Sequence, residues 1–200
     1  NIEGILEPTI RELAVEARLE RQRTRLLSRF DSSERVCFWE KYLTSFDLIL
    51  KSADFHKLLE IISDRLGSLS GVRLLDAGCG NGNFGAWLML AKNARRRLRN
   101  RPVIYVGIDY ASAALLEAER RFQEIRKEQI NRNTPERDHM EWILNVCDLN
   151  RPFPFLNSYF DKVCCNLVLS YVDDPHFTLS EIRRVLKVGG NVVVTSVKPL

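Results

Sequence analysis

The chain has 200 residues, of which 45% are hydrophobic and 28% charged, with a formal net charge of +4 at pH 7. This length suits one domain with a sizeable core, and the composition excludes a disordered chain. The small positive charge does not by itself indicate a nucleic-acid partner. No run of about 18 apolar residues is present to predict a membrane span.

The five cysteines and three histidines lack the spacing of a disulfide framework or a metal site. Cys147, Cys164 and Cys165 lie in apolar, strand-like runs, which is typical of buried thiols in a reducing compartment. The first residues carry acids where a secretory signal would be basic and then apolar. We therefore expect a cytoplasmic protein with no metal site, no disulfide and no covalent nucleophile.

Residues 1 to 70 are predicted to be helical throughout. Apolar side chains recur at helical spacing over residues 8 to 30, and a second helix is expected to reach about residue 48. A third helix is expected to be capped by Asp54 and to end at Gly67. We interpret this region as a helical lid or extension in front of the main domain.

After residue 70, short apolar runs alternate with helical segments. Strands are predicted at residues 72–77, 103–110, 140–149, 160–170 and 191–197. Helices are predicted at residues 83–98, 111–130 and 175–187, with Gly189 and Gly190 ending the last one. Strands that alternate with helices predict an α/β domain, with a mostly parallel sheet covered on both faces.

Polar residues follow the first four predicted strands. Asp76, Asp109, Asp148 and Asn166 each stand at or near the end of one of these apolar runs. In an open parallel sheet, ligands bind beyond the carboxyl ends of the strands. The sequence therefore predicts that these four positions meet at one rim and form a binding site.

Five segments resemble, in order and at ordinary spacing, the motifs of class I S-adenosylmethionine-dependent methyltransferases. They are LLDAGCGNG, VGIDYA, VCDLNRPFPF, FDKVCCNLVLSYVDDP and LKVGGNVVVTS. The resemblance covers about residues 38 to 198 and is nearest to the small-molecule, type 11-like branch. It implies S-adenosyl-L-methionine as cofactor, and a Rossmann-like sheet of strand order 3-2-1-4-5 within residues 71–200.

The resemblance also implies the residues that hold the cofactor. Asp76 would help to hold its amino group, directly or through water. Asp109, with Tyr110 beside it, would accept hydrogen bonds from the two ribose hydroxyls, a pairing that suits a carboxylate. Asp148 would receive the adenine amino group, and Leu149 would pack on the ring.

Further expected cofactor contacts come from small and lid residues. Gly78, Gly80 and Gly82 lack side chains, so the methionine part of the cofactor could lie against their backbone. Asn166 would offer backbone near the reacting end. In relatives an aromatic residue closes over the cofactor from the helical region, and Tyr42 is a candidate for that role.

No catalytic residue is assigned. Methyl transfer is an in-line displacement that needs a base only if the acceptor must lose a proton. Relatives often carry a histidine where Ser170 and Tyr171 stand here, and His176 is expected early in a surface helix. The acceptor is expected to be a small molecule, with the attacking atom left open.

Other interpretations remain. A dinucleotide-binding dehydrogenase would match Gly78 and Gly80, but Asn83 stands where its third glycine belongs. A non-catalytic cofactor-binding module that regulates a partner is a second alternative, and an RNA or protein methyltransferase a third. The basic stretch at residues 91–101 is interpreted as a solvent-exposed face of the protein rather than as a surface that contacts RNA.

The resemblance finally implies two more strands after the fifth, one of them antiparallel beside it. Without them the fifth strand would be an apolar edge with unpaired backbone groups. We therefore expect the native protein to continue well past residue 200.

Overall fold

The structure is a computed structural model that describes residues 34, 37–38, 52–91, 101–132 and 140–196. Most of the expected helices before residue 49, Tyr42 and most of the basic stretch lie outside these residues. The elements, in chain order, are α3 (Ala53–Leu66), β1 (Arg73–Ala77), α4 (Asn83–Leu90), β2 (Val103–Asp109), α6 (Ser112–Asn131), β3 (Met140–Val146), β4 (Phe160–Asn166), the 3-10 turn η2 (Leu169–Tyr171), α7 (Pro175–Val185) and β5 (Leu186–Thr195).

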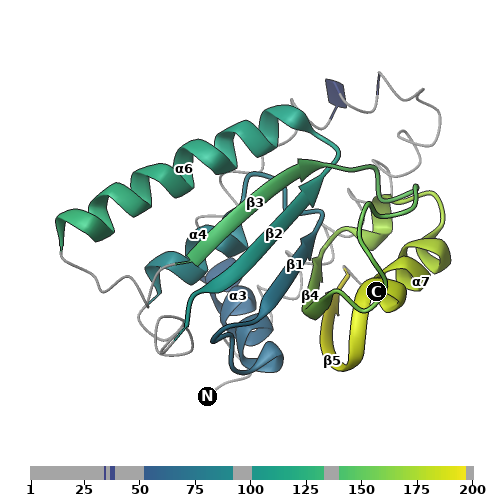
Figure 1. Ribbon diagram of the computed structural model, residues 1–200. Coiled ribbons are helices and arrows are strands. Elements are labelled where there is room, and N and C mark those ends of the chain that lie inside the picture. Colours follow the sequence, from purple (N-terminus) through teal and green to yellow (C-terminus); the bar gives the residue numbers. More distant parts are fainter. Residues whose placement is uncertain (1–33, 35–36, 39–51, 92–100, 133–139, 197–200) are drawn as a thin grey trace, which may run out of the picture.

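The five strands form one parallel sheet of order β3-β2-β1-β4-β5, as Figure 1 shows. This arrangement confirms the predicted fold class and strand order. β1 lies in the centre, and its end is therefore flanked by the ends of β2 and β4. The chain reverses its direction of winding at β1, which places the expected ligand site beside this strand.

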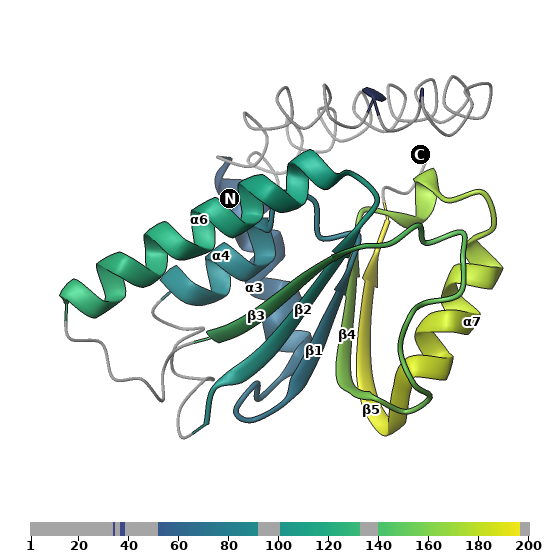
Figure 2. The same cartoon turned by 45° about the horizontal axis from the view of Figure 1, so that its top comes forward.

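Helices cover both faces of the sheet. α3, α4 and α6 lie on one face and α7 on the other, as Figure 2 shows. Alternate residues of each strand point to opposite faces, so β1 gives Leu74 to the core under α3, α4 and α6 and Leu75 to the core under α7. Two separate apolar cores result, one on each face of the sheet, and they bury most of β1 and β2 between them.

The helix boundaries correct the sequence prediction at two places. Ser52, rather than Asp54, caps α3, because its hydroxyl accepts a hydrogen bond from the Phe55 N–H at 3.2 Å. Gly67 ends this helix as predicted. α4 ends at Leu90, well before residue 98, and Ala91 is already extended.

The predicted role of Gly189 and Gly190 is wrong. α7 ends at Val185, β5 begins at the next residue, and both glycines lie inside that strand. β4 runs from Phe160 to Lys162 while its partners in β5 run from Leu186 to Asn191, so β5 carries three extra residues there. The glycines therefore lie in this irregular stretch of β5 and do not cap the helix.

Most of the described thiols are inaccessible. Cys79, Cys147, Cys164 and Cys165 are buried, and Cys37 is exposed. Cys164 and Cys165 have no exposed surface, which confirms them as core residues of β4. Within the ranges given above, no helix combines the length and the apolar character needed to cross a membrane.

Candidate functional site

The sheet brings three of the predicted polar residues to one face. The strand alternation that sends Leu74, Tyr105 and Cys164 into the core under α3, α4 and α6 gives Asp76, Asp109 and Asn166 the same facing. Asp76 lies between Gly107 of β2 and Cys164 of β4 in the register of the sheet. The predicted rim at the carboxyl ends of the strands is therefore built from β1, β2 and β4.

The loop after β1 is tied to the end of β2 by three consecutive backbone N–H groups. Those of Gly78 and Cys79 donate to the Ile108 carbonyl oxygen at 2.8 and 3.0 Å, and that of Gly80 donates to Asp109 Oδ2 at 2.8 Å. Loops that bind phosphate point such N–H groups at the anion. Here these three groups are already used within the protein, by the end of β2.

Three residues of this loop are glycines because their backbone has positive φ angles. The φ angle is 79° at Gly78, 53° at Gly80 and 73° at Gly82. Their missing side chains have different uses. A Cβ on Gly82 would lie 2.7 Å from Phe122 Cζ and 2.8 Å from Ala118 Cβ. The close packing of α6 therefore requires residue 82 to lack a side chain.

At Gly78 the neighbour is the segment after β4. A Cβ on this residue would lie 2.4 Å from Val168 Cγ2. The loop after β1 and the segment after β4 are therefore in contact. Gly78 thus lies where β1 and β4 form the rim, and its missing side chain leaves room for Val168.

Asp109 is hydrogen-bonded by backbone on both oxygens. Besides the Gly80 bond to Oδ2, the Ala111 N–H donates to Oδ1 at 2.9 Å. Burial raises the pKa of this carboxyl, and the N–H groups of Ala111, Gly80 and Tyr110 offset part of the rise. A carboxylate oxygen accepts more than one hydrogen bond, so both oxygens can still receive a donor. Tyr110, the next residue, is half-buried.

Asp76 is almost completely buried, with 2% of its surface exposed. Its Oδ2 accepts a hydrogen bond from the Tyr105 hydroxyl at 2.6 Å. Burial raises the pKa of Asp76 to about 7, and the nearby Asp109 adds to the rise while the Tyr105 bond opposes it. The acid predicted to hold a cofactor amino group is therefore poised to gain or lose a proton near neutral pH.

The sequence interpretation missed Tyr105. Its signal was present, because a tyrosine in an otherwise apolar strand needs a partner for its hydroxyl when buried. Residues 105, 107 and 109 share a face of β2, and Asp76 faces the same side from the neighbouring strand. The register of β1 against β2, which brings the two side chains together, is a tertiary feature.

The segment after β3 carries the predicted adenine contacts. β3 ends at Val146, earlier than expected, so Asp148 lies in a turn and its Oδ1 accepts from the N–H and the side-chain amide of Asn150, both at 2.9 Å. Leu149 belongs to the core under α7 and is 6% exposed. Its carbonyl oxygen accepts a hydrogen bond from the Thr178 hydroxyl at 3.2 Å, which holds this segment to α7.

The segment after β4 is held by β5. Asn166 Oδ1 accepts from the Thr195 hydroxyl, and the Leu167 N–H donates to the Thr195 carbonyl oxygen at 3.0 Å. Leu167 has a φ of 59°, rare for a branched residue. His176 is exposed in the first turn of α7, as expected. Across the described part of the chain, no three His, Cys, Asp or Glu side chains are grouped to hold a metal ion.

Known proteins are similar to this chain over the region that contains the rim. A family model described as a methyltransferase domain covers residues 75–194. A ubiquinone biosynthesis O-methyltransferase from Alkalilimnicola ehrlichii is 30% identical over 138 residues, 69% of this chain and 47% of that protein. A ubiquinone/menaquinone biosynthesis C-methyltransferase from Desulfotalea psychrophila is 29% identical over 68% of this chain and 45% of its own.

A solved structure has the same fold. Geranyl diphosphate C-methyltransferase from Streptomyces coelicolor, in complex with Mg²⁺, geranyl diphosphate and S-adenosyl-L-homocysteine, matches with a TM-score of 0.52 and 28% identity. The match covers 69% of this chain and 44% of that one. The chain spans about half the length of the curated relatives it matches.

Proposed function

The chain belongs to the methyltransferase domain family, and from this premise we propose that it binds S-adenosyl-L-methionine and transfers its methyl group to a small-molecule acceptor. The family model covers the strands and loops that form the rim, from Leu75 to Val194. Asp76, Asp109 and the loop between their strands lie within it.

One observation carries the proposal: the loop after β1 lies between two buried carboxyl groups. The N–H groups of residues 78–80 all donate to the end of β2, while Asp76 and Asp109 stand on either side with acceptor capacity left. This set of acceptors suits an ammonium group and a ribose diol. The match to a methyltransferase domain model argues against the dinucleotide-binding alternative.

The individual contacts follow from this fit. Asp76 would hold the amino group and Asp109 the ribose hydroxyls, with Tyr110 beside them. Asp148 and Leu149 would lie at the adenine, and the backbone of Gly78, Gly80 and Asn166 near the methionine part. Gly82 shapes the loop, and Tyr42 is proposed to close over the site.

When bound, the cofactor supplies a methyl group already activated for transfer. The chain would bind and orient it and exclude water, and no residue is assigned as a base. The named relatives include an O-methyltransferase, a C-methyltransferase and an enzyme of geranyl diphosphate, which support a small-molecule acceptor. We further propose a cytoplasmic location and no nucleic-acid partner.

Isothermal titration calorimetry with S-adenosyl-L-homocysteine tests the binding step. We expect saturable binding, and a folded sample that binds neither this product nor S-adenosyl-L-methionine would contradict the proposal. A turnover assay over quinol, phenol and isoprenoid acceptors then separates an enzyme from a module that only binds the cofactor. Binding without turnover on any acceptor would favour the module.

A further inference from the structure

We propose that Tyr105 is a positioning residue of the cofactor site, whose hydroxyl holds the Asp76 carboxyl so that cofactor binding is coupled to the release of a proton. This inference rests on the proposed function, because it assigns Asp76 to the cofactor amino group. The coupling itself follows from the surroundings of Asp76 in this structure.

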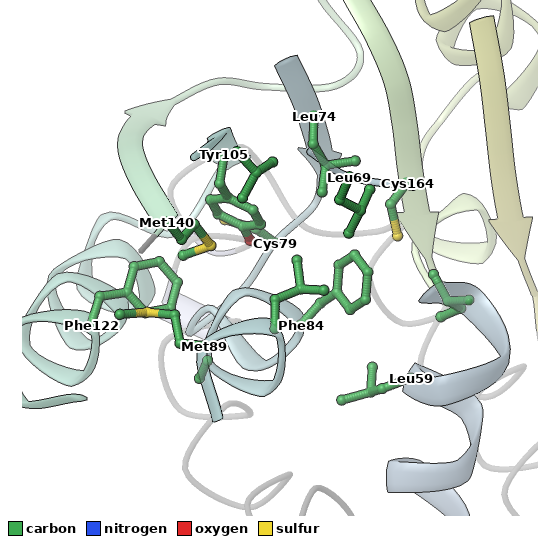
Figure 3. Packing of buried hydrophobic residues seen from close by; sticks show 14 of the residues in the cluster. Leu59, Leu69, Leu74, Cys79, Phe84, Met89, Tyr105, Phe122, Met140 and Cys164 are labelled. Carbon is green, nitrogen blue, oxygen red and sulfur yellow. The ribbon is translucent and has the colours of Figure 1, made fainter. Parts of the chain in front are cut away.

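The ring of Tyr105 is held in place by close packing on the sheet. It lies over Gly107, where an added Cβ would come within 3.1 Å of Tyr105 Cε1 and 2.8 Å of Cys79 Sγ. Phe122 of α6 packs edge-on against the ring, with centroids 5.7 Å apart (Figure 3). Tyr105 has no exposed surface, so its hydroxyl is directed at Asp76 by packing on all sides.

The groups around Asp76 favour its neutral form while the site holds no cation. Burial and the carboxyl of Asp109 both raise its pKa, and the single neutral donor that opposes them is Tyr105. Three thiols complete the titratable surroundings: Cys79 from the loop and Cys164 and Cys165 from β4. Burial raises the pKa of each thiol, so all three stay uncharged near neutral pH.

An ammonium group beside Asp76 changes this balance. A nearby opposite charge favours the ionised carboxylate, so the proton leaves Asp76 for the solvent as the ammonium group arrives. The Tyr105 hydroxyl then donates to a charged acceptor, and such hydrogen bonds are the stronger kind. Removing the hydroxyl raises the cost of ionisation and so weakens cofactor binding at pH values where Asp76 is protonated.

The test is calorimetric titration of the full chain with S-adenosyl-L-homocysteine at several pH values, and at pH 7 in two buffers of different ionisation enthalpy. With a pKa of about 7 for Asp76, the native protein should release about half a proton on binding at pH 7. Affinity should rise as the pH rises through that value. Asp76→Asn should abolish the release.

Tyr105→Phe should raise the pKa of Asp76 by about one unit, which lowers affinity about fivefold at pH 7 and about tenfold at pH 6. Above about pH 9 the two proteins should bind equally, because Asp76 is then ionised in both. The ligand's own titration is common to both and cancels. Tyr159→Phe, a matched change at a tyrosine stacked on Phe155 away from this site, should leave the whole profile unchanged.

Two results would overturn the proposal. One is an equal loss of affinity at every pH in Tyr105→Phe, which a purely structural role predicts. The other is binding by the native protein without proton release, a measurement that needs no variant to fold. A native protein that fails to bind at any pH would instead refute the proposed function.

Discussion

At the scale of single residues, Asp109 joins the end of β2 to the loop after β1, and its two oxygens accept from Gly80 and Ala111. Asp109→Ala should weaken S-adenosyl-L-homocysteine by ~2–4 kcal/mol, because two charge-assisted hydrogen bonds to the ribose are lost. Titration calorimetry measures the loss, and circular dichroism should show an intact fold. Asp54→Asn, a change at an exposed acid of α3, is the control and should bind normally. An unchanged dissociation constant for Asp109→Ala would show that the ribose lies elsewhere.

Gly82 illustrates the difference between a backbone requirement and a packing requirement. Gly82 and Gly189 have similar φ angles of 73° and 77°, but an added Cβ meets Phe122 and Ala118 at the first and nothing within 4 Å at the second. Gly189→Ala should therefore cost only the left-handed backbone, ~1–2 kcal/mol. Gly82→Ala should cost a further ~1–3 kcal/mol from overpacking. Chemical denaturation of both variants checks this, and equal losses would contradict the packing explanation.

At the scale of elements, Arg184 of α7 makes several of the hydrogen bonds that hold the segment after β3. Arg184 donates from Nη1 to the Phe155 carbonyl oxygen at 2.8 Å, from Nη2 to that of Phe153 at 2.9 Å, and to both oxygens of Glu181. Arg184→Lys keeps the charge but loses this fork, and should lower the free energy of unfolding by ~1–2 kcal/mol. Arg183→Lys, at the exposed neighbour, is the matched control and should be neutral in denaturant unfolding.

The same contact has a pH signature. Arg184 lowers the pKa of Glu181 from its usual 4.5, so the carboxylate stabilises the fold above that value. This stabilisation is lost as the pH falls through the lowered pKa of the folded state. Acid unfolding should therefore show a smaller dependence on pH in Arg184→Lys than in the native chain. Identical pH dependence in the two proteins would show that the pair does not couple to folding.

The elements also show how far sequence patterns predict this structure. The strands and their order followed from apolar runs and from the family resemblance, because those patterns mark burial in a sheet. The end of α4 and the place of Gly189 and Gly190 did not follow. A glycine pair after a helix fits a helix cap and an irregular strand equally well, and the pairing of β4 with β5 decides between them. The place of Asp109 at the end of β2 was readable from the chain, whereas the Tyr105–Asp76 bond needed the register of two strands.

At the scale of the whole molecule, ligand binding and folding are linked because the rim is built from separate parts of the chain. β1, β2 and β4 must be assembled before Asp76, Asp109 and Asn166 share one face. A ligand that binds only this folded state stabilises it, and S-adenosyl-L-homocysteine at about 100 times its Kd should add ~2.7 kcal/mol. Thermal unfolding at increasing ligand concentration measures this. Asp109→Ala should need correspondingly more ligand, and no shift in the native chain would argue against binding.

The cysteines differ in burial, so the rate at which each one is chemically labelled reports how often the structure around it opens. Cys37 is exposed, whereas Cys79 is buried within the glycine loop and Cys164 and Cys165 are buried in β4. An alkylating reagent reaches a buried thiol only when the structure around it opens. Labelling of Cys79 therefore follows movement of the loop itself, and labelling of β4 follows separation of the sheet from its helices. A single time course of cysteine alkylation thus distinguishes local opening of the loop at the cofactor rim from unfolding of the entire domain.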